Sequence, residues 1–368
     1  MGRVIYGVAG DAGGHVSRAL AIAEELRRRG HDIVFVGGGR VADLASRGYA
    51  VVPIAMFETK LSANGVRPLA SGFAGLAALA RSARTVARLC ALIREVRPDL
   101  IVTDYEHFLP LAARRLGYPS VSVDRQHALT LCRYDMPPGQ RVNRALTLSA
   151  IRLLYSAANR YLVSSFVAMQ PIDPARTEVF PPVLRREVGM HSVTDGEHAV
   201  AYLRGADLRW VRSVLGGRRR RFLIYGFDIA AEEGNLSFRR RSDAGFLADL
   251  AGCAYVVCNG GHNLICEALH YRKPLLCLPI RLFYEQLVNA HLLAQAGYGA
   301  CAAPAEGAVA LAAFEERLPA YSAQAAAYRT WMAQSIPQRL EQLMARPAER
   351  PTSYRGYAAA PDAGRDRV

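Results

Sequence analysis

Short apolar runs alternate with longer amphipathic stretches along most of the chain, and this pattern predicts an α/β protein. Apolar runs of strand length lie at residues 3–8, 32–36 and 100–103, with a helix predicted between the first two. Such runs are typical of strands that are buried on both faces of a parallel sheet. A second series of strands is predicted at residues 199–203, 221–225, 235–238 and 254–258. The two series indicate two helix-covered parallel sheets.

The chain is long enough for two domains. Its 368 residues exceed what one hydrophobic core usually organises. We place an N-terminal domain at residues 1–165 and a C-terminal domain at residues 166–345, with a proline-bearing linker over about 164–198. A final helix at about 323–344 is expected to return across the N-terminal domain. Residues 346–368 have too little apolar content to fold and predict a disordered tail.

A glycine turn follows the apolar run that ends at Cys258, and it indicates a ligand site. Gly260 and Gly261 let the backbone turn sharply and approach a ligand closely, and a helix is predicted from Asn263 onward. The free N–H groups at a helix start together carry roughly half a positive charge, and they can bind a diphosphate. Glu267, one turn into this helix, can accept two hydrogen bonds from a diol such as ribose.

The next predicted helix adds polar side chains that could bind sugar hydroxyls, namely Glu285, Gln286 and Asn289. An ordinary strand-turn-helix of a parallel sheet is the alternative explanation for the whole stretch. In that case the glycines serve only the turn, and Glu267 is a solvated helix residue. The spacing alone leaves both explanations open.

The first glycine turn of the chain carries a histidine. Gly13, Gly14 and His15 follow the first strand and open a helix. A nicotinamide site would need G-x-G-x-x-G and an acid at the next strand end, where residues 37–39 are all glycine, so a dehydrogenase is disfavoured. A lone histidine in such a turn is either a structural hydrogen-bonding residue or a general base.

Asp104 lies at the carboxyl end of the strand predicted at 100–103, the edge where parallel sheets gather ligands. An acid fixes the tautomer of a histidine base and stabilises its protonated form, so we expect Asp104 to pair with His15. A metal site built from the acids and histidine at 104–107 is the competing hypothesis. Candidates for the acceptor side of a cleft are Glu106, His107, Gln126 and His127.

The formal net charge of +14 is uneven, because residues 1–165 carry 22 Arg and Lys against 12 Asp and Glu. No basic run is interleaved with stacking aromatic residues, so nucleic acid is not an expected partner. The seven cysteines include no C-x-x-C pair and predict buried thiols in a reducing cytoplasm. No run approaches the ~20 apolar residues of a transmembrane helix.

Two predicted helices, at about 76–96 and 140–159, carry arginines beside their apolar positions. The simpler interpretation is a pair of helices that pack on the sheet and expose a solvated arginine face. The alternative is contact with anionic lipid or with a phosphorylated acceptor. We expect the protein to be cytoplasmic. On the second interpretation it is also peripheral on the inner face of the membrane, with its basic N-terminal half toward the lipid.

Several motifs resemble those of known glycosyltransferases. The segment NGGHNLICE, residues 259–267, resembles the signature of nucleotide-sugar glycosyltransferases with the GT-B architecture. His262 stands where plant members have Trp, and Leu264 stands where a hydroxyl residue is usual. The opening GDAGGHVSRALAIAEELRRRGHDIVFVGGG resembles the bacterial transferases that add N-acetylglucosamine to the lipid-linked peptidoglycan precursor. About residues 1–300 are similar to a less characterised bacterial and archaeal glycosyltransferase family, through YGVAGDAGGHVSRALAIA and YGFDIAAEEGNLSF among others.

The resemblance implies two Rossmann-like α/β domains that face each other across a cleft. It implies inverting, metal-independent transfer of a sugar from a UDP-linked donor to an acceptor hydroxyl of a lipid-linked or cell-envelope molecule, without a cofactor. His15 would be the base and Asp104 its partner. The donor site would comprise Gly13, Gly14, Arg204, Gly260, Gly261, His262, Asn263, Glu267, Glu285, Gln286 and Asn289. A nucleotide-sugar 2-epimerase of this architecture and a non-catalytic sugar-nucleotide binding protein remain alternatives.

Overall fold

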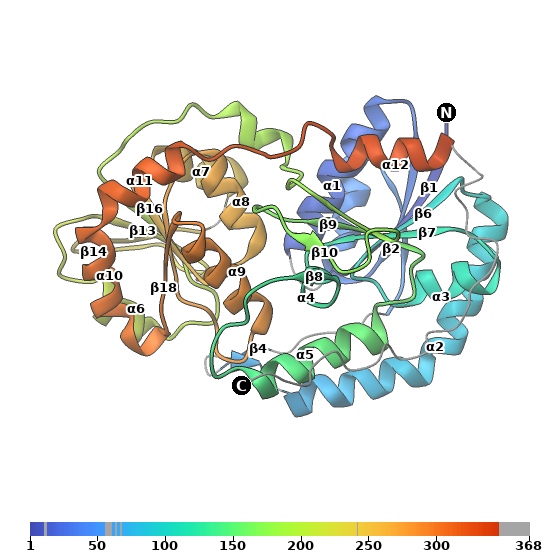
Figure 1. Cartoon of the computed structure of the whole chain (residues 1–368), viewed down its shortest axis with the longest axis horizontal. Coiled ribbons are helices and arrows are strands. Elements are labelled where there is room, and N and C mark those ends of the chain that lie inside the picture. Colours follow the sequence, from blue (N-terminus) through green and yellow to red (C-terminus); the bar gives the residue numbers. More distant parts are fainter. Residues whose placement is uncertain (11–12, 56–60, 63–64, 67, 241, 346–368) are drawn as a thin grey trace.

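The protein consists of two α/β units that lie beside each other along its long axis (Figure 1). This computed structural model describes residues 1–10, 13–55, 61–62, 65–66, 68–240 and 242–345. The predicted tail at 346–368 lies outside the described residues, as does part of the Gly- and Ser-bearing segment before the second helix.

The N-terminal sheet has seven parallel strands in the order β11-β9-β7-β6-β1-β2-β3. Its central strands are buried along nearly their whole length, which explains their continuous apolar sequences. The strands are β1 Arg3–Val8, β2 Asp32–Gly37, β3 Ala50–Pro53, β6 Leu100–Asp104, β7 Ser120–Asp124, β9 Arg160–Ser164 and β11 Thr177–Phe180.

Helices cover both faces of this sheet. On one face, Val4 and Tyr6 pack with Ile22 of α1 and with Leu340 of the last helix. On the other face, Ile5 and its neighbours pack with α2 and α3. The helices of this unit are α1 Gly13–Arg28, α2 Pro68–Val96, α3 Phe108–Arg115, α4 Ala128–Leu131 and α5 Arg141–Leu154, with the 3-10 helix η1 Gly39–Arg47. Two short ribbons pair β4 Leu61–Ser62 with β5 Gly65–Val66 and β8 Cys132–Arg133 with β10 Gln170–Pro171.

The C-terminal sheet also has seven strands, in the order β14-β15-β13-β12-β16-β17-β18, and all pairs except β14-β15 are parallel. The strands are β12 Ala199–Tyr202, β13 Phe222–Tyr225, β14 Ala231–Glu233, β15 Leu236–Phe238, β16 Tyr255–Cys258, β17 Leu275–Cys277 and β18 Gly299–Cys301. The helices are α6 Leu208–Leu215, α7 Asp243–Gly252, α8 His262–His270, α9 Tyr284–Gln295, α10 Gly307–Glu316 and α11 Leu318–Ala326, with η3 Pro304–Glu306. This arrangement confirms the predicted α/β fold of two Rossmann-like units.

The N-terminal sheet extends further along the sequence than the predicted limit at residue 165. Strand β11 pairs in parallel with β9 and so belongs to the first sheet. The crossing to the second sheet falls at residues 181–198, which include η2 Arg186–Met190. The prolines at 174, 181 and 182 lie close to the two ends of β11. The sequence of this short strand therefore looks like part of a linker.

The predicted helix at 323–344 is in fact two helices. Helix α11 ends at Ala326, and α12 spans Ile336–Ala345 and packs against α1 of the N-terminal unit, as Figure 1 shows. Pro337 lies in the first turn of α12, where the backbone N–H that proline lacks is not needed for a helical bond, so a new helix can begin there. Helix α2 begins earlier than expected, at Pro68, and α5 ends earlier, at Leu154. None of the described helices is long and apolar enough to cross a bilayer.

Candidate functional site

The N-terminal ends of α1 and α8 meet between the two sheets. Each helix follows the carboxyl end of a strand, α1 after β1 and α8 after β16, so the ligand-binding edges of the two sheets face each other. The side-chain amide of Asn263 donates a hydrogen bond of 2.8 Å to the carbonyl of Gly14 and links the two helix ends directly.

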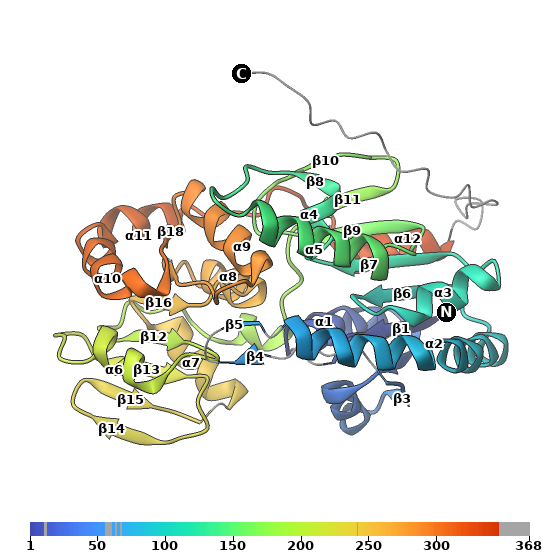
Figure 2. The ribbon, with the colours of Figure 1, turned by 90° about the horizontal axis from the view of Figure 1, so that it is seen from below.

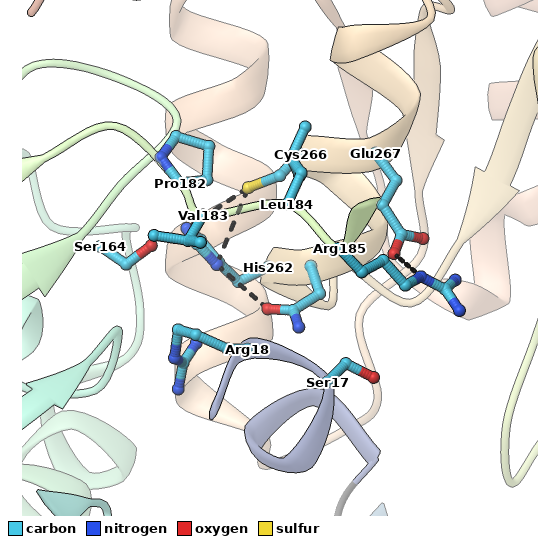
Figure 3. Close-up of a pocket in the computed structure, with 11 residues that line it drawn as sticks. Ser17, Arg18, Ser164, Pro182, Val183, Leu184, Arg185, His262, Cys266 and Glu267 are labelled. Atoms are coloured by element: carbon cyan, nitrogen blue, oxygen red, sulfur yellow. Dashed lines mark hydrogen bonds and ion pairs between the residues drawn. The ribbon is translucent and has the colours of Figure 1, made fainter. Parts of the chain in front are cut away.

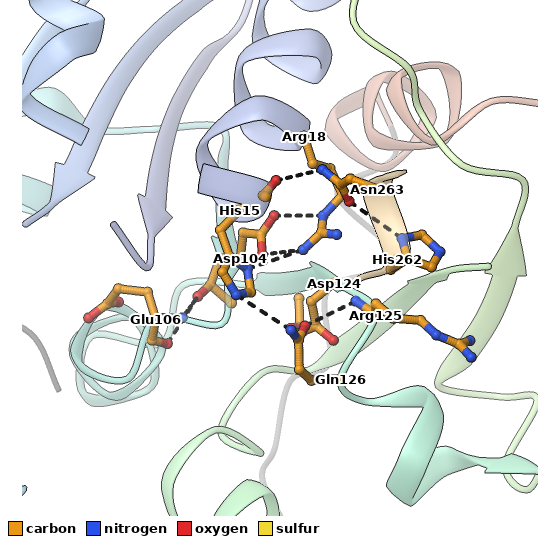
Figure 4. A network of polar contacts seen from close by, with 12 residues as sticks. His15, Arg18, Asp104, Glu106, Asp124, Arg125, Gln126, His262 and Asn263 are labelled. Carbon is orange, nitrogen blue, oxygen red and sulfur yellow. Dashed lines mark hydrogen bonds and ion pairs between the residues drawn. The ribbon is translucent and has the colours of Figure 1, made fainter. Parts of the chain in front are cut away.

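His15 and Asp104 form a buried pair at this junction (Figure 4), as the sequence predicted. His15 lies in the first turn of α1, and Asp104 is the last residue of β6. Their Nδ1 and Oδ1 atoms are 2.6 Å apart, and Asp104 is fully buried. We assign the proton to Nδ1, because a carboxylate can only accept there. The Nε2 atom of His15 then carries a lone pair.

Arg18 completes this group, and the sequence analysis missed it. Its Nε and Nη2 atoms donate to the two carboxylate oxygens of Asp104 at 2.8 and 2.6 Å. Arg18 is 4% exposed, so this is a buried, bidentate ion pair. Its position one helical turn after His15 is the signal that could have revealed it, because residues i and i+3 share a helix face.

The surroundings set the charge of these groups. Burial lowers the pKa of His15, but the charge of Asp104 and its hydrogen bond raise it by more, so the pKa of His15 lies above its ordinary value. Burial likewise opposes the charge on Arg18, and Asp104 outweighs this opposition, which raises the pKa of the guanidinium. The net result is a histidine whose affinity for a proton is raised by the carboxylate beside it.

The glycine turn before α8 has one position that requires glycine and one that is open. Gly260 has φ +83°, and a Cβ there would lie 2.7 Å from the carbonyl of Gln286. Gly261 has φ −67° and nothing within 4 Å of where its Cβ would be, so it leaves open space beside the helix start. In the other unit, a Cβ on Gly14 would lie 3.7 Å from the side-chain nitrogen of Asn263, and a Cβ on Gly13 would meet only the end of the Arg40 side chain.

Asn259 holds the neighbouring loops in place. Its side chain accepts a bond of 2.8 Å from the backbone N–H of Arg204 and donates one of 3.2 Å to the carbonyl of Leu278. The loop after β12 is thereby tied to the loops after β16 and β17. Arg204 itself is exposed, so its backbone rather than its side chain is fixed here.

A pocket lies between α1, α8 and the segment that crosses between the two sheets (Figure 3). Burial lowers the pKa of His262, and the nearby cations Arg125 and Arg18 lower it further, so this ring is neutral. Glu267 lies at the pocket with its Oε1 atom 2.9 Å from Nε of Arg185, and both side chains are about one-tenth exposed. The lining residues are Ser17, Arg18, Ser164, Pro182, Val183, Leu184, Arg185, His262, Asn263, Cys266 and Glu267.

Two consecutive residues after β7 bind helix α9 of the other unit. Gln126 donates to Glu285 at 2.9 Å, and Arg125 donates to Asn289 at 2.9 Å. The amide nitrogen of Gln126 also lies 3.4 Å from Nε2 of His15. Glu285 and Asn289 are four residues apart on α9 and therefore share one face of that helix.

The three predicted donor-binding residues of α9 have different surroundings. Asn289 is fully buried, and its nitrogen donates to the carbonyl of Gly260 at 3.2 Å. Gln286 accepts from the backbone N–H of Ile280 at 3.1 Å. Of the three side chains, Glu285 alone contacts a residue that also touches His15. The predicted sugar-binding role therefore fits the geometry of Glu285 better than that of Asn289.

Three of the four acceptor-side candidates have at least one polar side-chain atom bonded to the protein scaffold. Glu106 caps α3 by accepting from the backbone N–H groups of Phe108 and Leu109, each at 2.7 Å. Burial raises its pKa to about 7. His107 donates to the carbonyl of Leu154, and Nδ1 of His127 lies 2.6 Å from Asp124. Gln126 is the candidate that the structure brings to His15.

The competing metal hypothesis placed Asp104, Glu106 and His107 around one ion. Their side chains turn instead to three separate partners, namely the group of His15 and Arg18, the start of α3 and the end of α5. Within the described ranges, no three His, Cys, Asp or Glu residues are grouped so that they could hold a metal ion.

Comparison with solved structures shows the class of the fold. The chain resembles the glycosyltransferase of kitacinnamycin with a TM-score of 0.63 and 18% identity, covering 95% of this chain and 99% of that one. It resembles the MurG protein of Acinetobacter baumannii with a TM-score of 0.59 and 14% identity, covering 94% and 99%. The fold is therefore that of the GT-B glycosyltransferases.

Sequence comparison gives the family. Residues 2–319 match the model of glycosyl transferase family 1, and the chain belongs to this family. A Halorhodospira halophila relative, the UDP-N-acetylglucosamine–N-acetylmuramyl-(pentapeptide) pyrophosphoryl-undecaprenol N-acetylglucosamine transferase, is 29% identical over 80% of this chain and 83% of its own. An uncharacterized glycosyltransferase of Methanosarcina acetivorans is 24% identical over 81% and 84%. The predicted activity class, sugar transfer, is thereby confirmed.

Proposed function

We propose that this glycosyltransferase is inverting and metal-independent, and that it moves a sugar from a UDP-linked donor to an acceptor hydroxyl. The observation that carries the proposal is the pair of His15 and Asp104, 2.6 Å apart, at the junction with the N-terminal end of α8. The pair can accept a proton, and the helix end can accept an anion. These are the two requirements of direct displacement of a nucleoside diphosphate.

The donor side of the proposal rests on α8. A Cβ on Gly261, just before this helix, would meet nothing within 4 Å, and the helix dipole favours the negative charge of a leaving diphosphate. A helix end can stabilise this charge as a cation would, which supports the metal-independent mechanism. The name of the Halorhodospira relative contains UDP-N-acetylglucosamine, and the structurally similar VinC, with a TM-score of 0.62 and 16% identity, was solved in complex with DTDP.

In the proposed reaction, the acceptor O–H gives its proton to Nε2 of His15 while its oxygen bonds to the anomeric carbon. The bond from that carbon to the diphosphate breaks, and the diphosphate leaves toward α8. Asp104 accepts from Nδ1 throughout and stabilises the imidazolium that forms. General-base help of this kind is worth about 10²- to 10⁴-fold in rate. The absence of an acid at Asn259, where retaining relatives tend to have Glu, supports inversion.

Two carboxylates are the proposed contacts for the rest of the donor. Glu285 reaches toward the reaction centre through Gln126 and would bind sugar hydroxyls. Glu267 would bind the ribose diol beside its contact with Arg185, since each carboxylate oxygen can accept more than one hydrogen bond. Arg185 would then hold the carboxylate in place for the diol.

The acceptor is proposed to be lipid-linked, and helix α5 is the proposed contact with an anionic membrane. Its outer face exposes Val142 at 74%, Leu146 at 67% and Leu153 at 82%, with helical spacing that places them in one stripe. Exposed arginines flank the stripe at positions 141 and 152. Figures 1 and 2 show α5 beside α2 on one side of the N-terminal unit. Apolar insertion combined with basic flanks is the chemistry that binds anionic lipid.

The membrane contact predicts that the protein binds vesicles of anionic lipid and leaves them as salt rises, because exposed charges are screened. Leu146→Ser should weaken this binding several-fold in a sedimentation assay. Val309→Ser is the matched control, since Val309 is equally exposed, at 76%, on α10 of the other unit. Equal binding to neutral vesicles, or equal effects of the two substitutions, would contradict the assignment to α5.

The function itself is tested by nucleotide release. The protein should release UDP from a UDP-sugar only when an acceptor with a free hydroxyl is present, and the product should have the opposite anomeric configuration. Release without acceptor together with a changed sugar would instead indicate a 2-epimerase. Donor binding without any turnover across lipid-linked and soluble acceptors would indicate a binding protein.

A further inference from the structure

Tyr105 has an unusual backbone conformation directly beside the site. Its φ is +55°, a left-handed value that large side chains rarely adopt, and it follows Asp104 in the sequence. Strained residues of this kind persist only where the surrounding structure fixes them, and they are concentrated at functional sites.

The surrounding turn fixes this conformation from both sides. Thr103 Oγ1 donates to the carbonyl of Glu106 at 3.0 Å and accepts from its N–H at 3.2 Å, which closes a loop around Tyr105. The carboxylate of Glu106 is in turn bonded to the start of α3. On the other side, the carbonyl of Asp104 accepts from the N–H of Ala9 at 3.0 Å. These contacts hold the backbone of Tyr105 in its strained conformation, and Glu106 is one of the residues that make them.

The ring of Tyr105 belongs to a stack that includes His15. The His15 and Tyr105 rings are parallel within 6°, with centroids 5.6 Å apart. Tyr105 also stacks on Tyr155, at 3.8 Å and 13°. Tyr155 directly follows the last residue of α5, Leu154, whose carbonyl accepts from His107. The stack therefore connects the imidazole to the end of a helix that is itself anchored.

The hydrogen bond to Asp104 alone leaves one motion open to His15. A ring held at Nδ1 can still tilt about the axis of that bond, and such a tilt moves Nε2 out of line with an acceptor hydroxyl. A parallel ring beside the imidazole opposes this tilt, because offset stacking has a preferred plane. Asp104 thus fixes one atom of His15, and Tyr105 fixes the plane of its ring.

We infer that Tyr105 is a positioning residue for His15, and that its left-handed backbone is retained because this conformation brings an aromatic ring alongside the imidazole. The inference rests on the proposed role of His15 as the base. It assigns no contact with substrate to Tyr105. Its effect is on the orientation of Nε2 and hence on the proton-transfer step.

Three substitutions separate the ring from the backbone. Tyr105→Phe keeps the ring, Tyr105→Leu keeps a large side chain in the strained backbone without a ring, and Tyr105→Asn suits a positive φ without a ring. We expect Phe to retain kcat within about twofold, and Leu and Asn to lose about 10- to 100-fold, as for a misplaced catalytic group. KM and UDP affinity should stay unchanged in all three. The Asn variant should unfold at or above the wild-type temperature.

The Tyr105→Phe and Tyr105→Leu variants share the same backbone strain. Their comparison therefore isolates the effect of the aromatic ring on kcat, and it does not depend on the stability of Tyr105→Asn. Wild-type kcat in the Leu variant, or equal losses in Phe and Leu, would overturn the inference. A loss that appears only in KM would also overturn it. His15→Ala is measured in the same series. If His15→Ala keeps the wild-type rate, the proposed base is wrong. If His15→Ala is inactive while Tyr105→Leu is fully active, only the positioning role of Tyr105 is refuted.

Discussion

Replacing Arg18 with Met should destabilise the protein far more than replacing any exposed arginine. The substitution keeps most of the aliphatic length but removes both bonds to Asp104, of 2.8 and 2.6 Å. Asp104 is fully buried, so its charge would be left with His15 alone. Removing one partner of a buried ion pair costs about 3 to 5 kcal/mol of unfolding free energy. Since 1.4 kcal/mol corresponds to about tenfold, the ratio of folded to unfolded protein would fall at least about 100-fold.

The same substitution should make stability depend on pH. Arg18 lowers the pKa of His15 at present, so its removal should raise this pKa further. A histidine with a raised pKa contributes stability that is complete below about 6.5 and is lost as pH rises through the folded-state value. The destabilisation of Arg18→Met should therefore be greater at pH 8.5 than at pH 6. In activity assays, the acid limb of the pH-rate profile should move to higher pH.

Urea unfolding followed by circular dichroism at the two pH values measures these effects. The matched control is Arg28→Met on the same helix, where Arg28 is 62% exposed in its pair with Glu25. Such surface pairs contribute about 0 to 1 kcal/mol. If Arg18→Met costs no more than Arg28→Met, or if its cost is the same at both pH values, the account of the buried group is wrong.

Two further predictions concern the donor side. Gly260→Ala should lower both thermal stability and UDP-sugar affinity, because its Cβ would meet a carbonyl at 2.7 Å with φ at +83°, whereas Gly261→Ala should lower affinity alone. If calorimetry finds that Gly261→Ala lowers stability and affinity together, as Gly260→Ala does, Gly261 is not part of the donor site. Glu267→Ala should weaken UDP-sugar binding by roughly 1 to 3 kcal/mol, with Arg185→Ala as the control for their ion pair. Unchanged affinity of Glu267→Ala would exclude the ribose assignment.

The parts of this structure that follow from local sequence were predictable. Strand β1 and the turn from β16 into α8 lie within a residue or so of their predicted limits, because buried parallel strands give continuous apolar runs. The pairing of His15 with Asp104 was also predictable, because residues at the carboxyl ends of adjacent parallel strands meet at one edge.

The pairings of Arg125 and Arg185 were not predictable, because nothing in their local sequence indicates their distant partners, whereas Arg18 could have been found from its position one turn after His15. Arg18 pairs across 86 positions, Arg185 across 82 and Arg125 across 164. The chain is rich in arginine throughout, so composition does not distinguish these three from solvated ones. Strand β11 escaped prediction for a similar reason, since its place is set by pairing with β9 and not by its own short, proline-flanked sequence.

The most direct test of the proposed chemistry is the turnover of His15→Ala measured together with its affinity for UDP. The proposed donor site lies mainly on α8 and α9, so the affinity should remain close to that of the wild type, while kcat falls by about two to four orders of magnitude. Asp104→Asn should lose less, and the double substitution should be little worse than His15→Ala, because the two residues act as one unit. A wild-type rate in His15→Ala, or losses that multiply in the double variant, would show that the proton is taken by another group.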